Sequence, residues 1–246
     1  MSRESGARPS GEAGSGRRPP GPAQRRLFLG YLVVASALLA LFFGLYALVP
    51  SWRDALVEED RGIENATIVL FLAAFLVACA AIRRRGLARL PRGYALIGLV
   101  GLLATLEELS YGQRLFPDLR FPELSDGATF DALHDVNHVI ALALDGAGVP
   151  WPIVLGLVGA AGLALAVLLR EPLARLLREN LRADRVWLYM LFGVACMLVS
   201  IGIDTLSGPS RRLVLIEELA EMGAGTSVLF AALAGFVTGR SDRATG

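Results

Sequence analysis

Lysine is absent from this chain of 246 residues, and all 24 of its basic residues are arginine. Together with the abundance of alanine, glycine and leucine, this composition indicates a GC-rich bacterial genome more than any particular chemistry. The net charge is only +1, and the charges lie between hydrophobic segments without forming a basic patch. The composition therefore gives no reason to expect nucleic acid as a partner.

Cysteine and histidine are also scarce. The two cysteines, Cys79 and Cys196, both lie within apolar runs, where cysteine more often packs as a small hydrophobic side chain than forms a disulfide. The two histidines are His134 and His138. Aliphatic side chains are nearly missing from residues 1–26, which are rich in glycine, proline, serine and arginine. That segment is predicted to be a disordered cytoplasmic tail.

Hydrophobic residues make up 54% of the chain, and the mean hydropathy is +0.53. Several apolar runs approach or exceed the roughly 20 residues that cross a bilayer, which excludes an ordinary soluble domain. The first run is longer than the ~7–15 residue core of a cleaved signal peptide. We predict an all-α membrane bundle over residues 27–238, followed by a short tail at 239–246. Its six transmembrane helices are expected at about 27–49, 63–83, 93–110, 150–169, 186–204 and 212–238.

The arginines predict the orientation of this bundle. Eighteen of them lie in the two tails and in the loops at 83–92 and 170–185, whereas six lie in the three alternate loops. Because arginine accumulates on the cytoplasmic side, both termini are expected in the cytoplasm of a bacterial cell, with the protein in the inner membrane.

The second outer loop, about 111–149, is the only long one. Its second half, from about 129 to 144, carries an apolar stripe at helical spacing that includes Phe130, Leu133 and Ile140. The segment is too short to cross a bilayer. We therefore expect an interfacial or re-entrant helix there.

Acidic residues occur in or beside the apolar runs, and the predicted topology places all of them near the extracytoplasmic face. Ionisable side chains at membrane depth are costly and usually functional. A functional site is therefore expected among Glu64, Glu107, Glu108, Asp204, Glu217, Glu218 and Glu221.

The last predicted span carries three of these glutamates. Glu217 and Glu221 are four residues apart and share one helical face. If the helix begins near Ser210, they lie beyond the first turn, where the helix dipole would stabilise a carboxylate. The alternative is that they pair with Arg211 and Arg212.

The third predicted span ends in Glu107 and Glu108, where the helix dipole disfavours negative charge. The energetic cost of this placement is expected to be offset by a bound cation, by a proton shared between carboxylates, or by pairing with Arg114. The two side chains differ by about 100° around the helix, so only one can point squarely into a given cleft. The alternative is a solvated helix end.

His134 and His138 are four residues apart on one face of the predicted loop helix, and Asp135 precedes His138 by three. These spacings occur among paired imidazole ligands and in carboxylate-x-x-His motifs, although neither is specific.

Several carboxylates crowded at low dielectric must share protons or bind a cation. We predict a divalent metal, Zn²⁺, Mn²⁺ or Fe²⁺, held by His134, His138 and Glu217 or Glu221. Glu108, as general base, and Arg114 are the predicted catalytic residues. The expected rim or surrounding residues are Glu64, Glu107, Asp135, Asp204 and Glu218.

The stretch Glu107-Glu108-x-Ser110-Tyr111-Gly112-Gln113-Arg114 resembles a signature of uncharacterised bacterial multipass membrane proteins, Glu-Glu-x-Ser-aromatic-Gly-Gln-Arg. Such proteins also carry an acidic pair before span two, a loop histidine and glutamates in the last span, matched here by Glu59-Asp60 with Glu64, by His134 and by Glu217-Glu218. The resemblance would cover about residues 55–235 and implies an architecture without an activity.

Two groups of membrane hydrolases are similar more loosely. CAAX-protease-like enzymes use a glutamate pair with an arginine four residues after the second glutamate, but Gly112 stands there and Arg114 comes six after Glu108. Alkaline-ceramidase-like enzymes gather histidines, an aspartate and a serine around zinc, with spacings that this chain does not reproduce.

The residues together favour a metal-dependent hydrolase acting on a lipid or a membrane-associated substrate near the outer leaflet. Membrane lipids are the expected partners, and the substrate and the oligomeric state stay open. The alternatives are a proton- or cation-coupled transporter and a non-catalytic scaffold or sensor.

Overall fold

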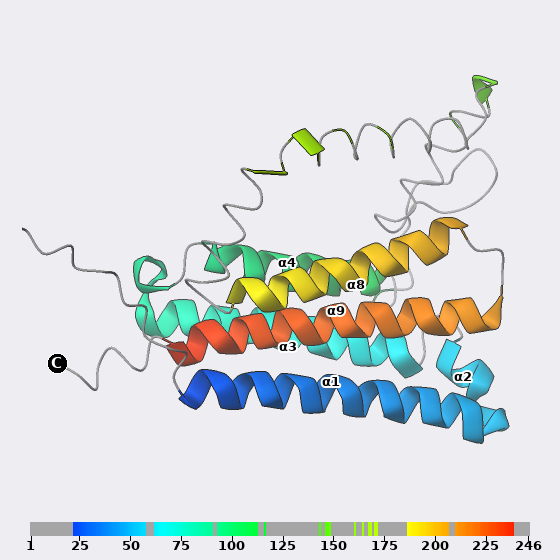
Figure 1. Ribbon diagram of the computed structural model, residues 1–246, viewed down its shortest axis with the longest axis horizontal. Helices are drawn as coiled ribbons and strands as arrows, with labels where there is room; N and C mark the ends of the chain where they lie inside the picture. Colours follow the sequence, from blue (N-terminus) through cyan, green and yellow to red (C-terminus); the bar gives the residue numbers. More distant parts are fainter. Residues whose placement is uncertain are drawn as a thin grey trace, which may run out of the picture.

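The computed structural model describes residues 22–57, 62–90, 93–112, 186–206 and 210–238, with short pieces at 116, 143, 146–148, 160, 164, 167–168 and 170–171. Within these ranges every regular element is helical, as Figure 1 shows. The predicted all-α fold class is confirmed for this part of the chain.

Among the residues that the structure describes, four helices are long and apolar enough to cross a membrane. They are α1 (Pro22–Leu48), α3 (Gly62–Arg85), α8 (Val186–Leu206) and α9 (Arg211–Thr238). Their bounds lie close to those of the first, second, fifth and sixth predicted spans. Helices of this length and hydropathy are typical of a protein that spans a membrane.

The third predicted span, 93–110, forms a shorter helix than expected. Helix α4 (Tyr94–Glu108) has 15 residues and is about 22 Å long, less than the ~30 Å hydrocarbon core. The fourth predicted span, 150–169, lies outside the described residues apart from positions 160, 164 and 167–168. Six spans therefore remain a prediction.

Short helices connect the long ones. After α1 come η1 (Pro50–Trp52) and α2 (Arg53–Val57), and η2 (Leu87–Arg89) follows α3. A last short turn, η3 (Ser110–Gly112), follows α4.

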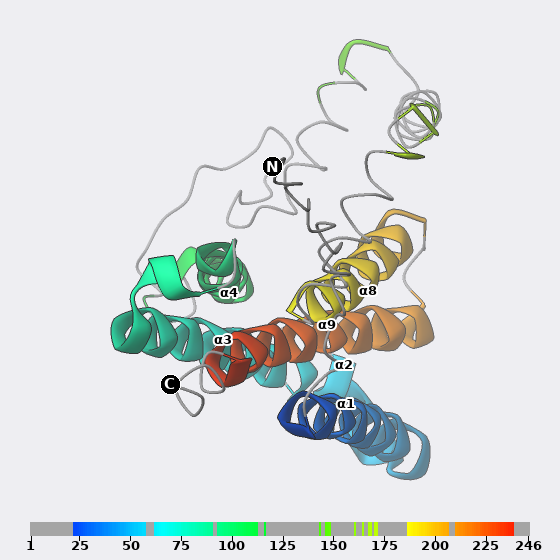
Figure 2. The same ribbon diagram turned by 60° about the vertical axis from the view of Figure 1, so that its left-hand side comes forward.

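Helix α9 is the centre of the bundle and contacts α1, α3, α4 and α8. Of its most apolar window, 61% is buried, compared with 6% for α1 at the periphery. Figure 2 shows α1 and α8 on different sides of α9. Small residues let neighbours approach closely, since a Cβ on Gly225 would lie 3.1 Å from Leu70 Cβ.

Aromatic side chains fill the core between α1, α8 and α9. The rings of Tyr31 and Tyr189 meet edge to face at a centroid distance of 5.2 Å, and Phe230 lies 5.4 Å from Tyr31. The Tyr31 hydroxyl shares a hydrogen bond of 3.0 Å with Ser227 Oγ. Ser227 Oγ in turn donates to the carbonyl of Gly223, so both of these hydroxyls are paired inside the bundle.

Both cysteines are free thiols, as the sequence predicts. Cys79 is exposed on α3. Cys196 Sγ packs against Gly223, where a Cβ would lie 3.2 Å from the sulfur. Its role in the structure is that of a small apolar side chain.

Candidate functional site

Glutamates from three helices lie at one end of the bundle, which we call the acidic end. Glu64 is in the first turn of α3, Glu107 and Glu108 are the last residues of α4, and Glu217, Glu218 and Glu221 lie in the first half of α9. The start of α3, the end of α4 and the start of α9 all belong to this end. Figure 1 shows the start of α9 beside α2 at the right of the view.

Close contacts at two glycines of α4 show how far along the bundle axis its glutamates lie relative to those of α3. Gly98 and Gly101 of α4 lie against Ala78 and Phe71 of α3, where added Cβ atoms would be 3.3 Å from Ala78 Cβ and 3.0 Å from the Phe71 carbonyl oxygen. The two helices are antiparallel, so continuing this register brings Glu108 to within about one turn of the level of Glu64.

The register between α3 and α9 places a third glutamate there. Gly225 lies against Leu70 and Thr67, and the two helices run in the same direction. One turn towards the start of each helix, Glu221 is therefore level with Glu64. The fold thus brings glutamates from α3, α4 and α9 to one depth of the bundle.

Glu221 is held by a neighbouring helix. The Ser200 hydroxyl of α8 donates a hydrogen bond of 2.7 Å to Glu221 Oε1, and Ser200 is buried. Sequence reasoning did not select Ser200. Its only signal is that it precedes Asp204 by four residues, on one face of the same helix.

Glu218 has a carboxylate oxygen, Oε2, that is buried in the protein. Its neighbours in the sequence, Leu215, Leu219 and Met222, pack with Ile63 and Leu56 in an apolar cluster. A carboxylate oxygen this close to an apolar core loses its hydration, so its burial is costly unless it is paired.

The end of α4 has an unusual backbone. Ser110 (φ 45°) and Tyr111 (φ 48°) both adopt the left-handed conformation, which costs non-glycine residues about 1–3 kcal/mol each. Tyr111 thereby comes back to hydrogen-bond with Glu107. Burial, followed by the negative charge of Glu107 and this hydrogen bond, raises the pKa of the Tyr111 phenol. Glu107 thus has a neutral donor at the helix end.

Several predicted site residues lie outside the described residues, namely Arg114, His134, Asp135 and His138. For Asp204 the structure describes the helix but not the side chain. Within the described part of the chain, no three histidine, cysteine, aspartate or glutamate side chains are arranged to hold a metal ion. A metal site at the acidic end would therefore need at least one ligand from outside the described side chains.

No protein-family model, no curated protein and no solved structure matches this chain.

Proposed function

We propose that the chain is a multipass protein of a bacterial inner membrane, with both termini cytoplasmic and the acidic end at the extracytoplasmic face. The arrangement of charge supports this orientation. Arg83, Arg84 and Arg85 end α3 on the side opposite the acidic end, and arginine accumulates on the cytoplasmic side of membranes.

The acidic end is proposed to bind a divalent metal, Zn²⁺, Mn²⁺ or Fe²⁺, for the hydrolysis of a lipid or a membrane-associated substrate. The observation that carries this proposal is the hydrogen bond from Ser200 to Glu221. Metal ligands are commonly oriented by such neighbours. Carboxylate and imidazole donors suit these metals, so Glu221, which Ser200 orients, would join His134 and His138 in preference to Glu217.

When bound, such a metal lowers the pKa of a coordinated water towards about 7. Glu108 is proposed to take the water's proton, because it ends α4 within about one turn of the level of Glu64 and Glu221. Arg114, six residues further, is proposed to meet negative charge on the substrate.

The metal content of protein purified in mild detergent without chelators tests the proposal. We expect close to one metal per chain in the wild type and a loss of at least tenfold in affinity in Glu221→Gln and His134→Ala. Glu64→Gln is the matched control, because it removes the same charge at the rim and should keep the metal. Wild-type protein without stoichiometric metal would contradict the proposal.

A proton- or cation-coupled carrier is the second candidate, and the position of the glutamates on α9 favours it. Because α9 contacts α1, α2, α3, α4 and α8, a change of charge at Glu218 or Glu221 would act on the whole described bundle. Flux in proteoliposomes that disappears in Glu217→Gln, from protein that binds no metal, would favour the carrier over the hydrolase.

A further inference from the structure

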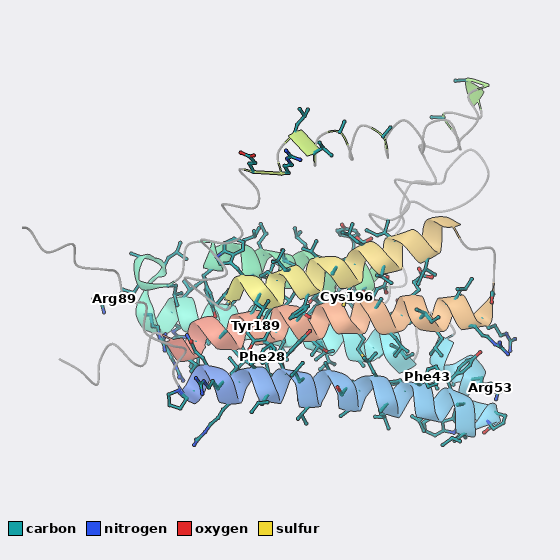
Figure 3. The ribbon with its side chains drawn as sticks, in the orientation of Figure 1. Phe28, Phe43, Arg53, Arg89, Tyr189 and Cys196 are labelled. Atoms are coloured by element: carbon teal, nitrogen blue, oxygen red, sulfur yellow. The ribbon has the colours of Figure 1, made fainter. Side chains whose placement is uncertain are left out.

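Arginines gather at the end of the bundle opposite the acidic end. Arg83–Arg85 form the last turn of α3, and η2 places Arg89 directly after the chain reverses at Gly86. Figure 3 shows Arg89 and Arg53 at opposite ends of the bundle. Residues 65–90 contain no aspartate or glutamate that would offset these charges.

One of these arginines, Arg85, has a structural role. Arg85 donates hydrogen bonds to the carbonyl oxygens of Gly235, at 3.1 Å, and Phe236 at the end of α9. The guanidinium of Arg84 lies 5.4 Å from the centre of the Phe236 ring, a cation–π distance, and its side chain is exposed. Arg83 and Arg89 are exposed as well.

Helix α1 adds two more exposed arginines, Arg25 and Arg26, at the same level. Tyr31 of α1 packs on Phe230 of α9, and the two helices run in opposite directions. Five or six residues before Tyr31 therefore correspond to the level of Phe236. The described part of α1 and residues 222–238 of α9 contain no acidic residue.

We propose that these exposed arginines bind the phosphate groups of anionic phospholipids in the adjacent leaflet. Guanidinium groups pair with phosphate oxygens through two parallel hydrogen bonds, and basic residues at a membrane surface attract anionic lipids. The proposal does not depend on the function of the acidic end. We call the arginine surface the set Arg25, Arg26, Arg83, Arg84 and Arg89.

The neighbouring apolar side chains favour a lipid over free phosphate. Leu29 and Val33 of α1 and Leu87 of η2 are exposed next to the arginines along the chain. A phospholipid would place its phosphate on the arginine surface and its acyl chains along these side chains. Inorganic phosphate would gain only the first of these contacts.

Binding of fluorescent phosphatidylglycerol to the delipidated full chain in neutral detergent micelles tests this proposal. We expect saturable binding that weakens as salt rises, no comparable binding of labelled phosphatidylcholine, and no competition by inorganic phosphate at constant ionic strength. Arg83→Gln/Arg84→Gln should weaken the affinity about 25-fold, at about tenfold for each 1.4 kcal/mol. Arg83→Lys/Arg84→Lys, which keeps the charge, should stay within about fivefold of the wild type.

The matched control is Arg211→Gln/Arg212→Gln, an adjacent pair of exposed arginines at the acidic end. It removes the same charge and should change the affinity less than about twofold. An equal loss of lipid affinity in the two double variants would show that only net charge matters and would overturn the proposal. Competition by inorganic phosphate, or equal binding of phosphatidylcholine, would overturn it too.

Discussion

At the arginine-bearing end of the bundle, charged side chains lie where the helix dipoles favour their charge. At the acidic end, several lie where the dipoles disfavour it. Arg83–Arg85 lie in the last turn of α3, and Arg85 binds the last carbonyls of α9, where positive charge is favoured. At the acidic end, α4 finishes in Glu107 and Glu108, and α9 begins with Arg211 and Arg212. The dipole disfavours both of these placements.

This difference separates residues that stabilise the bundle from residues that are candidates for function. Residues that are placed against such local preferences, at a cost in folding stability, are expected at functional sites. Glu64 follows the rule, because it lies in the first turn of α3, which fits its predicted position at the rim. Glu107, Glu108 and the glutamates of α9 lie on the two helices whose charge placement breaks the rule. The comparison therefore points to the same residues as the proposed function.

The largest expected effect on stability is at the packed end of α9. The Tyr94 ring occupies the space that a Cβ on Gly235 would need, and its hydroxyl donates a 2.6 Å hydrogen bond to the Ala232 carbonyl. We expect Gly235→Ala to lower the free energy of unfolding by about 2–3 kcal/mol. Gly44→Ala is the control, because a Cβ there meets nothing within 4 Å. Thermal unfolding in detergent measures both, and equal melting temperatures would show that this end is not tightly packed.

Arg85→Gln should have the next largest effect. The substitution removes the hydrogen bonds of a charged donor to Gly235 and Phe236. We expect a loss of about 2 kcal/mol in the free energy of unfolding. Arg83→Gln removes the same charge from an exposed side chain and should stay within about 0.5 kcal/mol of the wild type. Equal losses in the two variants would contradict the capping role of Arg85.

At the acidic end, Ser200→Ala should cost only about 0.6 kcal/mol, typical of a hydrogen bond between membrane helices. Its effect on metal affinity should be larger, about tenfold, because it removes the group that orients Glu221. Calorimetry and a metal titration on the same preparation compare the two. Loss of stability without loss of affinity would assign Ser200 a structural role.

The smallest effect concerns alkaline pH. Because the pKa of Tyr111 is raised in the folded state, the unfolded chain loses this proton first as pH rises. The contribution of Tyr111 to stability is therefore complete below about pH 10 and is lost as pH rises through the folded pKa. Tyr111→Phe should show a smaller decrease in melting temperature between pH 9 and 11 than the wild type. Identical decreases would contradict the contact with Glu107.

The long helices could be predicted from the sequence because each contains an apolar run of about the length that crosses a bilayer. The predicted span at 212–238 and helix α9 (Arg211–Thr238) differ by one residue at the start. Helix α4 ended earlier than predicted because Ser110 and Tyr111 turn into the left-handed conformation. Periodicity carries no signal for such a turn at serine and tyrosine.

The contacts between helices could not be predicted, because they depend on register. The approach of Ser200 to Glu221, and of Tyr94 to Gly235, is set by small residues of α9 and its neighbours, not by local pattern. The alternation of spans along the chain predicts that these glutamates lie near one end of the bundle, and the start of α3, the end of α4 and the start of α9 lie together there. His134, His138 and Arg114, outside the described residues, remain predictions.

Titration of metal-free protein with Mn²⁺, followed by electron paramagnetic resonance of the unbound ion, tests the metal site at the acidic end most directly. The account predicts one saturable site in the wild type and in Glu64→Gln, and at least tenfold weaker binding in Glu221→Gln. Indistinguishable titrations of wild type and Glu221→Gln would contradict it.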